Sequence, residues 1–277
     1  MAATITAGVR RELSKRVVPG LLALTLALTT GTAAAQVACG DTVGPGATVT
    51  LTDDVGPCDG INTAIIVDSA TLDLGGHTLS CADGNADADV PYGIVLVGKK
   101  AAVRNGTVSG CWHGVVAAGS GKHTIEGVTV TASYQDGVYV PEDSAKNRIS
   151  GITSIANLDD GFEIRGSKNA VSSSVAQGNG EDGIDLVDGT ANKVTSNTAS
   201  GNADDGIDVG GDRNKVQHNT VDGNGGVGIT VHGARNRIVG NTVSGSGAGV
   251  DLYGADGCGS NKWRGNSYGA SAPDCVH

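Results

Sequence analysis

Hydrophobic and polar residues alternate in short runs that recur about every 22 residues between residues 136 and 254. In each unit a glycine opens a run whose apolar residues stand at every second position, as in GIDL at residues 183–186. A period of two is typical of a β-strand, and no window of a dozen residues shows the helical period of 3.6. A repeat of this length is typical of a solenoid, so each unit is predicted to be a coil of two or three short strands.

Parallel stacking of such coils would bring equivalent residues to within about 4.8 Å of one another. The apolar positions then form two interior columns, which are Ile184, Ile207, Ile229 and Val250, and Leu186, Val209, Val231 and Leu252. Asparagines form two further columns, which are Asn157, Asn179, Asn202 and Asn224, and Asn197, Asn219, Asn241 and Asn266. Stacked asparagine side chains can hydrogen-bond to one another along the axis. The sequence therefore predicts an all-β chain folded as a single-stranded parallel β-helix, whose hand does not follow from spacing.

Two outward columns are predicted for the strand that follows the repeated glycine. The first is Val95, Val116, Tyr139, Glu163, Asp185, Asp208, Thr230 and Asp251. The second is Val97, Ala118, Pro141, Arg165, Val187, Gly210, His232 and Tyr253. A further acidic row, Asp136, Asp160, Asp182 and Asp205, directly precedes the glycines. Carboxylates from different coils are thus expected to lie side by side.

Like charges at that spacing repel by about 1–4 kcal/mol per pair. Bound Ca²⁺, which takes carboxylate oxygens, would relieve the repulsion. A shared proton would also relieve it, as would ordinary solvation by salt. The candidate metal ligands are Glu163, Asp185, Asp208, Asp160, Asp182 and Asp205. A second candidate for calcium is the acidic loop at residues 82–91, although it lacks the glycine and distal glutamate of an EF-hand.

A basic ridge is predicted on another face, because a cation directly follows the asparagine that opens the second half of most units. Its members are Arg148, Lys193, Lys215, Arg237 and Lys262, with Ala170 as the interruption. Such a row could follow a polyanionic glycan, or could simply keep the surface soluble. Lys193, Lys215, Arg237 and Tyr253 are the candidate glycan-binding residues.

The N-terminus reads as a secretory signal peptide, because basic residues precede an apolar run at residues 17–28 and a small-residue site at Ala33-Ala34-Ala35. Cleavage near Ala35 would place the protein outside the cell. Without residues 1–35, which hold four basic residues and Glu12, the chain keeps 15 basic and 28 acidic residues, a net charge of −13. This charge disfavours a nucleic-acid partner. No later apolar stretch is long enough for membrane insertion, and a monomer is expected.

The six cysteines all follow the signal peptide, and their even number predicts disulfides. Of the fifteen possible connectivities we favour Cys39–Cys58, Cys81–Cys111 and Cys258–Cys275, because neighbours near the two ends can staple coils that lack a further coil to pack on. The predicted organisation is a signal peptide at 1–35, an N-terminal cap at 36–60, a parallel β-helix at 61–254 and a C-terminal cap at 255–277, with disulfides stapling the caps.

Several segments resemble a known family. LDLGGHTLS, GIVLVGKKAAVRNGTVSGC and the recurring pattern NxVxxNTxxxNxxDGIDV are similar to the right-handed parallel β-helix repeats of the pectate-lyase-like superfamily, with its NosD-like, carbohydrate-binding and sugar-hydrolase repeat proteins. The resemblance covers roughly residues 61–268, and the right hand of the helix is implied by it. The alginate-epimerase motif DPH is absent, and the polygalacturonase motifs are incomplete.

The resemblance implies interaction with polysaccharide. In the superfamily's polysaccharide lyases, acidic residues hold calcium, calcium and basic groups neutralise a uronate carboxylate, and an arginine or lysine removes the C5 proton. By this analogy Arg165 is the candidate base, with Asp185, Tyr139 and His232 as further catalytic candidates. The expected function is a secreted polysaccharide-interacting protein, which could be a calcium-dependent lyase on acidic (uronate) glycans. The alternatives are a surface ion pair at Arg165 and a non-catalytic glycan-binding or cell-surface structural module.

Overall fold

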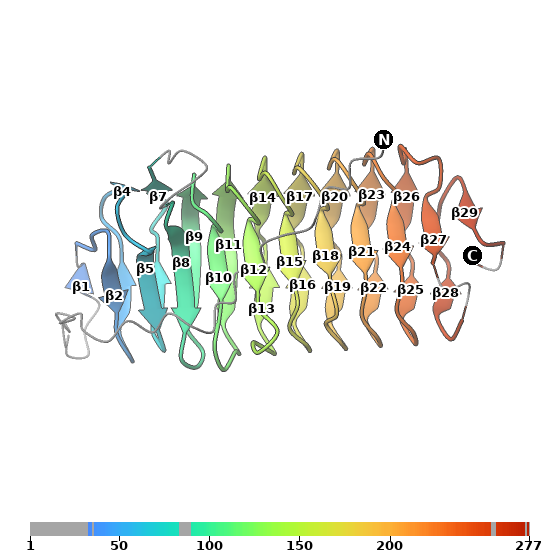
Figure 1. Cartoon of the computed structure of the whole chain (residues 1–277). Coiled ribbons are helices and arrows are strands. Elements are labelled where there is room, and N and C mark those ends of the chain that lie inside the picture. Colours follow the sequence, from blue (N-terminus) through green and yellow to red (C-terminus); the bar gives the residue numbers. More distant parts are fainter. Residues whose placement is uncertain (1–32, 35, 83–89, 256–258, 275, 277) are drawn as a thin grey trace, which may run out of the picture.

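The computed structural model describes residues 33–34, 36–82, 90–255, 259–274 and 276, and every regular element in them is a β-strand. The chain winds into one elongated solenoid of parallel strands (Figure 1). None of the described segments is a helix that could traverse a lipid bilayer. The acidic loop proposed as a calcium site lies mostly outside the described residues, because residues 83–89 are not described.

One side of the solenoid is an 11-stranded sheet, here called sheet B. Its strands are β2 (Asp41–Val43), β5 (Thr63–Asp68), β8 (Tyr92–Val97), β10 (Val115–Ala117), β12 (Val138–Val140), β15 (Phe162–Ile164), β18 (Ile184–Leu186), β21 (Ile207–Val209), β24 (Ile229–Val231), β27 (Leu252–Gly254) and β29 (Ser271–Ala272). Each pairs in parallel with the next, so every coil contributes one strand to this sheet.

The other side is an 18-stranded sheet, sheet A, which has two rows. The first row holds β3 (Thr48–Thr50), β6 (Thr71–Asp73), β13 (Arg148–Ser150), β16 (Ala170–Ser172), β19 (Lys193–Thr195), β22 (Lys215–Gln217), β25 (Arg237–Val239) and β28 (Lys262–Arg264). The second row holds β4 (Val55–Cys58), β7 (Thr78–Cys81), β14 (Thr153–Ile155), β17 (Val175–Gln177), β20 (Thr198–Ser200), β23 (Thr220–Asp222) and β26 (Thr242–Ser244). The long strands β9 (Ala102–Ser109) and β11 (Thr124–Thr131) belong to both rows, and the two-residue strand β1 (Ala33–Ala34) pairs with β3. Most coils thus have three strands and three corners, and in the coils of β9 and β11 one long strand passes through both rows.

Parallel pairing extends into both predicted caps. β2, β3 and β4 pair with strands of the next coil, and β28 and β29 pair with β25 and β27. The solenoid is therefore built from more of the chain than the predicted residues 61–254.

Apolar columns fill the interior as the alternation predicts. Ile184, Ile207 and Ile229 lie in register and are fully buried. The prediction for the last repeat is wrong by two residues, because Leu252 rather than Val250 pairs with Ile229, and Gly254 rather than Leu252 pairs with Val231. The turn before β27 is longer than its counterparts, so alignment on the glycine alone misplaced this strand.

Buried asparagines form three side-chain ladders along the axis. The two predicted columns are confirmed by amide-to-amide bonds such as Asn179 Nδ2 to Asn202 Oδ1 at 2.9 Å and Asn197 Nδ2 to Asn219 Oδ1 at 3.1 Å. A third ladder passes through the asparagines that open the second half of each unit: Asn147, Asn169, Asn192, Asn214, Asn236 and Asn261. The asparagine side-chain oxygens accept hydrogen bonds from buried backbone N–H groups at the corners, which apolar side chains could not do.

Two of the predicted disulfides are confirmed. Cys39 bonds to Cys58 and Cys81 bonds to Cys111, with Cα–Cα distances of 5.4 and 5.0 Å. Both lie in the N-terminal coils. The third predicted pair, Cys258–Cys275, lies outside the described residues.

Replacing Asn202 by alanine should destabilise the fold. The Asn202 Oδ1 atom accepts from Asn179 N and Nδ2 at 3.1 and 2.9 Å, and its Nδ2 donates to Asn224 Oδ1 at 2.8 Å. Alanine leaves buried polar groups unpaired, so the free energy of unfolding should fall by about 1–3 kcal/mol. Urea unfolding measures this, with the exposed Thr220→Ala as control. Equal stability of the two variants would contradict a supporting role for the ladder.

Candidate functional site

The outer face of sheet B carries a dense group of carboxylates, here called the acidic stripe. It consists of Glu163, Asp185 and Asp208 on the strands, Asp136, Asp160, Asp182 and Asp205 just before them, and Asp159, Glu181 and Asp204 one position earlier. Glu163 pairs with Asp185 and Asp185 pairs with Asp208, as the spacing predicts. The structure thus brings all six candidate metal ligands into one region.

The row before the strands forms an aspartate ladder. The Oδ1 atom of each member accepts the backbone N–H one coil later, at 2.8 Å from Asp160 to Asp182 N and 2.7 Å from Asp182 to Asp205 N. The same bond ends the row at Val227 N, 2.6 Å from Asp205. One oxygen of each carboxylate in this row therefore accepts a backbone hydrogen bond.

Three sets of carboxylates in the stripe have one oxygen each within 4.8 Å of the others. They are Asp136, Asp159 and Asp160; Asp182, Asp185 and Asp208; and Asp182, Asp204 and Asp205. The second set joins the strand column to the aspartate ladder. Among the described residues, Asp208 Oδ1 and Asp136 Oδ2 are buried oxygens without a hydrogen-bond partner. Oxygen ligands grouped in this way fit the coordination that Ca²⁺ prefers.

Burial and mutual repulsion raise the pKa of these carboxyl groups. Desolvation is the larger cause for Asp185 and Asp182, whose pKa values rise to about 8, with repulsion from Asp208 and Asp205 respectively adding to it. Asp160 rises to about 10 for the same reasons. Desolvation also raises the pKa of Asp205 and of Asp208. These upward pKa shifts have the direction expected of carboxyl groups that share protons, which is one of the three ways of relieving the repulsion.

Arg165 and Glu163 form a close ion pair at one end of the stripe. Desolvation raises the pKa of both Glu163 and Asp136 to about 7, and repulsion from Asp136 adds to the shift of Glu163. Burial is the largest single influence and lowers the pKa of Arg165, but the contributions of Glu163, Tyr139 and Asp185 together outweigh it, so the net shift is upward. The guanidinium is thus held in its charged form.

Three stacked rings adjoin this end of the stripe. His113 stacks between Tyr92 and Tyr139, with ring centroids 5.5 and 4.8 Å away. Its Nδ1 atom lies 3.0 Å from Asp136 Oδ2, without the alignment of a hydrogen bond. Desolvation lowers the pKa of His113 to about 4, which keeps the ring neutral. Burial raises the pKa of the Tyr139 phenol to about 12, and the nearby Glu163 adds to the shift.

His113 was missed in the sequence, although a signal was present. It directly precedes Gly114, as Asp136 precedes Gly137, and the two glycines occupy equivalent positions in the sheet. His113 therefore belongs to the row that becomes the aspartate ladder in the next coil.

The other predicted site residues are distributed along the same face. Tyr139 pairs with Glu163, and His232 follows β24 with its Nε2 atom 3.7 Å from Asp208 Oδ1, longer than a hydrogen bond. Tyr253 pairs with Thr230 and so belongs to the first outward column, where the sequence alignment had placed Asp251. Asp251 is instead buried, and it accepts bonds from Ser246 Oγ and from Gly269 N at 2.7 and 2.6 Å.

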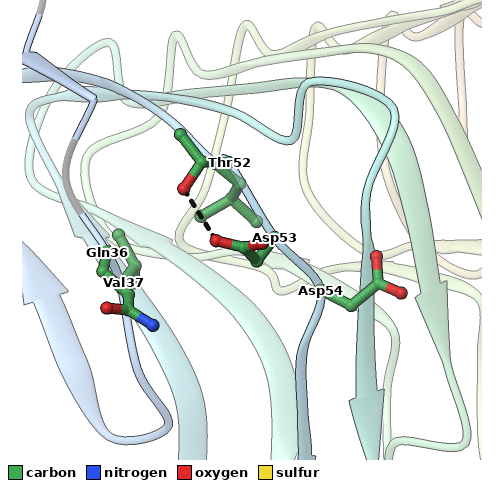
Figure 2. Close-up of a pocket in the computed structure, with 6 residues that line it drawn as sticks. Gln36, Val37, Thr52, Asp53 and Asp54 are labelled. Atoms are coloured by element: carbon green, nitrogen blue, oxygen red, sulfur yellow. Dashed lines mark hydrogen bonds between the residues drawn. The ribbon is translucent and has the colours of Figure 1, made fainter.

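Lys193, Lys215 and Arg237 lie outside the acidic stripe. They lie in register on the first row of sheet A, one strand further along each coil. A small hollow at the N-terminal end of the solenoid is also remote from the stripe (Figure 2). Its lining includes Val37 and Asp53, and its volume of about 30 Å³ is too small for a sugar.

The described geometry is that of a right-handed parallel β-helix with an acidic outer face. The chain belongs to the family described as the right handed beta helix region, whose pattern matches residues 92–268, more than half of the sequence. No curated protein matches the chain.

Solved structures share this fold at low sequence identity. The A-module of the mannuronan C-5 epimerase AlgE4 from Azotobacter vinelandii has a TM-score of 0.63 and 17% identity, over 84% of this chain and 74% of that one. The Dettilon tailspike protein (gp208) has a TM-score of 0.58 and 15% identity, over 86% of this chain and 53% of that one. The A-module of AlgE6 from the same bacterium has a TM-score of 0.51 and 16% identity, over 83% and 79%. These likenesses describe the fold.

Stability should fall with rising pH when divalent cations are absent. The carboxyl groups of Asp182 and Asp185 have pKa values of about 8 in the folded chain, above the ordinary value of 3.8. Groups with raised pKa values stabilise the fold below their unfolded pKa, and this contribution is lost as pH rises through the folded value. The melting temperature in EDTA should therefore fall between about pH 5 and about pH 9.

Asp185→Asn should flatten this dependence, because the amide carries no charge at any of these pH values. Added Ca²⁺ should raise the melting temperature more at the alkaline end. A melting temperature in EDTA that rises across the same range would contradict raised pKa values in the stripe.

Proposed function

We propose that this chain is an exported polysaccharide-binding protein whose site is the acidic stripe, and that the stripe holds Ca²⁺. The observation that carries the proposal is the convergence of Asp182, Asp185 and Asp208 within 4.8 Å, with a buried Asp208 oxygen that has no hydrogen-bond partner. A bound cation would replace the protons that the repelling carboxyl groups otherwise keep.

An acidic polysaccharide is the ligand class that such a site would take. Calcium on the stripe would present positive charge to a uronate carboxylate, which the bare stripe would repel. A linear polymer suits an outer face whose equivalent positions repeat about every 4.8 Å. The mannuronan epimerase modules of similar fold support a saccharide ligand by analogy of fold alone.

Export is supported by the two disulfides, which persist in oxidising compartments. We assign residues 1–35 to a cleaved signal peptide on the sequence pattern described above. We also propose that the protein acts as a monomer.

Eliminative cleavage of the bound glycan is a candidate activity at the Glu163 end of the stripe. Calcium would supply neutralisation of the uronate carboxylate, which acidifies the C5 proton. Asp185 would bind the cation, Tyr139 would position the sugar at this end, and Arg165 would be the nearest basic group. His232, beside Asp208, would contact the polymer at the other end of the stripe. Arg165 can accept a proton only after it loses one, and the Glu163 ion pair opposes that loss.

A non-catalytic glycan-binding role is the second candidate, and the short connections favour it. The turns on the two sides of β18 have six residues each, so they build no tall wall around a substrate. A catalytic pocket normally encloses its ligand and excludes water. The open face is better suited to holding a polymer than to reacting with it.

Calcium binding should depend on the central acids of the stripe. Asp185→Ala removes one of three converging ligands and should weaken Ca²⁺ affinity at least about tenfold, because cation sites of this kind depend on ligand number and charge. Isothermal titration calorimetry at about pH 8 measures the Ca²⁺ affinity of the two variants and of the unmodified protein. Asp222→Asn is the matched control, since this exposed carboxylate lies on the second row of sheet A. Equal affinity of the two variants would contradict the assignment.

A panel of uronate polymers separates the two candidate roles. A lyase releases an unsaturated product that absorbs in the ultraviolet, and both EDTA and Asp185→Ala should abolish the absorbance. Calcium-dependent binding without absorbance would support the non-catalytic role. Neither binding nor absorbance with any uronate polymer would contradict the proposed function.

A further inference from the structure

Eleven of the fifteen lysines and arginines beyond residue 35 gather along one long edge of the solenoid, here called the basic edge. The edge runs where the turns leaving sheet B enter the first row of sheet A, along the bottom of the solenoid in Figure 1. Five members lie at the first position of a strand: Arg148, Lys193, Lys215, Arg237 and Lys262. Six lie in the preceding turn: Lys100, Lys122, Lys146, Lys168, Arg213 and Arg235. All eleven side chains are exposed.

The turn cations occupy equivalent corners of successive coils. Each stands two residues before a strand of the first row, and backbone bonds such as Lys146 N to Ser167 O and Arg213 N to Ala234 O link one corner to the next. The turn column and the strand column therefore run side by side along the axis.

Where one column lacks a cation, the other column supplies one in the same coil. Where Ala170 interrupts the strand column, Lys168 lies in the same coil, and where Ala191 interrupts the turn column, Lys193 does. Each of the eight successive coils from Lys100 to Lys262 keeps at least one cation. The result is a continuous line of cations about 34 Å long, at about 4.8 Å per coil. Among the described residues, the same turns also hold four carboxylates, which are Glu142, Asp143, Asp188 and Asp212.

The backbone at these corners disfavours the residues that occupy them. All six turn cations have positive φ, from 57° at Lys100 to 63° at Lys146 and Lys168. This left-handed conformation is cheapest for glycine and is tolerated by asparagine. Long cationic side chains at six of seven consecutive corners, from Lys100 to Arg235, are therefore not explained by the turn itself.

The other two corners of each coil provide an internal comparison, because they have the same left-handed backbone. The corner between the two rows of sheet A holds Asn105, Gly127, Gly151, Ser173, Ser196, His218, Gly240 and Gly265. The corner after the second row holds Gly110, Ala132, Ala156, Gly178, Gly201, Gly223 and Gly245. Neither has a lysine or arginine. Most residues at these two corners are small, and lysine or arginine occupies the left-handed position at only one of the three corners of the described coils.

Most cations of the basic edge make no ion pair with a carboxylate. Among its described members, only Arg235 makes an ion pair, with Asp212 at 3.2 Å. This contrasts with Arg165 on sheet B, which Glu163 neutralises. Apart from Arg235, the cations of the edge are exposed and have no ion-pair partner among the described residues, although the chain carries a net charge of −10.

We propose that the basic edge is a second polysaccharide-binding surface, which holds an anionic glycan chain lengthwise without calcium. The choice of an anionic polysaccharide as the ligand rests on the proposed function. The new elements are the place where it binds, the basic edge, and its binding to lysine and arginine without Ca²⁺. One cation per coil matches a polymer that carries one negative charge per sugar, because a sugar unit and a coil are of comparable length. Ca²⁺ on the acidic stripe and cations on the basic edge would then hold anionic glycan on neighbouring surfaces by different chemistry.

Binding of a fluorescently labelled polygalacturonate oligosaccharide, measured in EDTA, isolates the edge from the stripe. Lys193→Gln, Lys215→Gln and Arg237→Gln combined in one variant should weaken this binding about tenfold, as expected for three exposed charge contacts. Raising the salt concentration should weaken wild-type binding more steeply than binding by the variant. The control combines Gln177→Glu, Thr220→Glu and Thr242→Glu, which lowers the net charge equally on exposed positions of the second row. Its affinity should stay within about twofold of wild type.

A second variant separates binding from folding. Lys146→Gly, Lys168→Gly and Arg213→Gly remove charge and supply the residue that positive φ favours, so the melting temperature should not fall while the affinity does. A loss of affinity in both variants, with the control unaffected, supports the inference.

Three results would overturn the inference, and they differ in what they imply for the stripe. If polygalacturonate binds only with Ca²⁺ and only Asp185→Ala abolishes binding, the edge is not a glycan surface and the proposed function stands. If no uronate polymer binds with or without Ca²⁺, both proposals fail. If the edge substitutions instead abolish self-association or preferential binding of duplex DNA, the edge serves a second copy or a nucleic acid.

Discussion

The register between successive coils is the constraint on which the rest of this molecule depends. Parallel backbone bonds set the spacing, and the buried asparagine ladders keep it constant at the corners, where the strand ladder is interrupted. Because the register is maintained, side chains about 22 residues apart in the sequence become lateral neighbours. The interior columns, the acidic stripe and the basic edge all follow from this one relation, and none of them exists within a single coil.

In the acidic stripe, the register between coils places carboxyl groups so close together that they repel one another. Each acid is placed by its own coil, yet its ionisation is governed by its neighbours and by burial, which is why the pKa values of Asp182 and Asp185 rise together to about 8. Backbone N–H donors lower the pKa of the aspartate ladder but do not offset desolvation. Carboxyl groups that cannot all ionise without repelling one another are the kind of group to which the proposed cation would bind.

The sequence predicted the solenoid, the apolar columns and the pairing of Glu163 with Asp185 and Asp208, because period-two alternation and a fixed repeat translate directly into register. It misplaced the last repeat, where Val250 and Leu252 fit the alternation equally well and only the longer preceding turn distinguishes them. It also missed the stacking of His113 between Tyr92 and Tyr139, which depends on side-chain rotation and not on position in the repeat. The size of the pKa shifts could not be predicted from the sequence, because the shifts depend on how deeply each carboxyl group is buried in the folded coil.

The acids of the stripe on sheet B and the cations of the basic edge form two columns along the solenoid, and their separation across the solenoid contributes a dipole moment perpendicular to its long axis. A rod polarised in this way experiences a torque in the field of a charged surface before any atom makes contact, although physiological salt confines the effect to about 8 Å. Rotation of the solenoid about its long axis, as well as diffusion, would then determine which of its sides faces a charged surface at first contact.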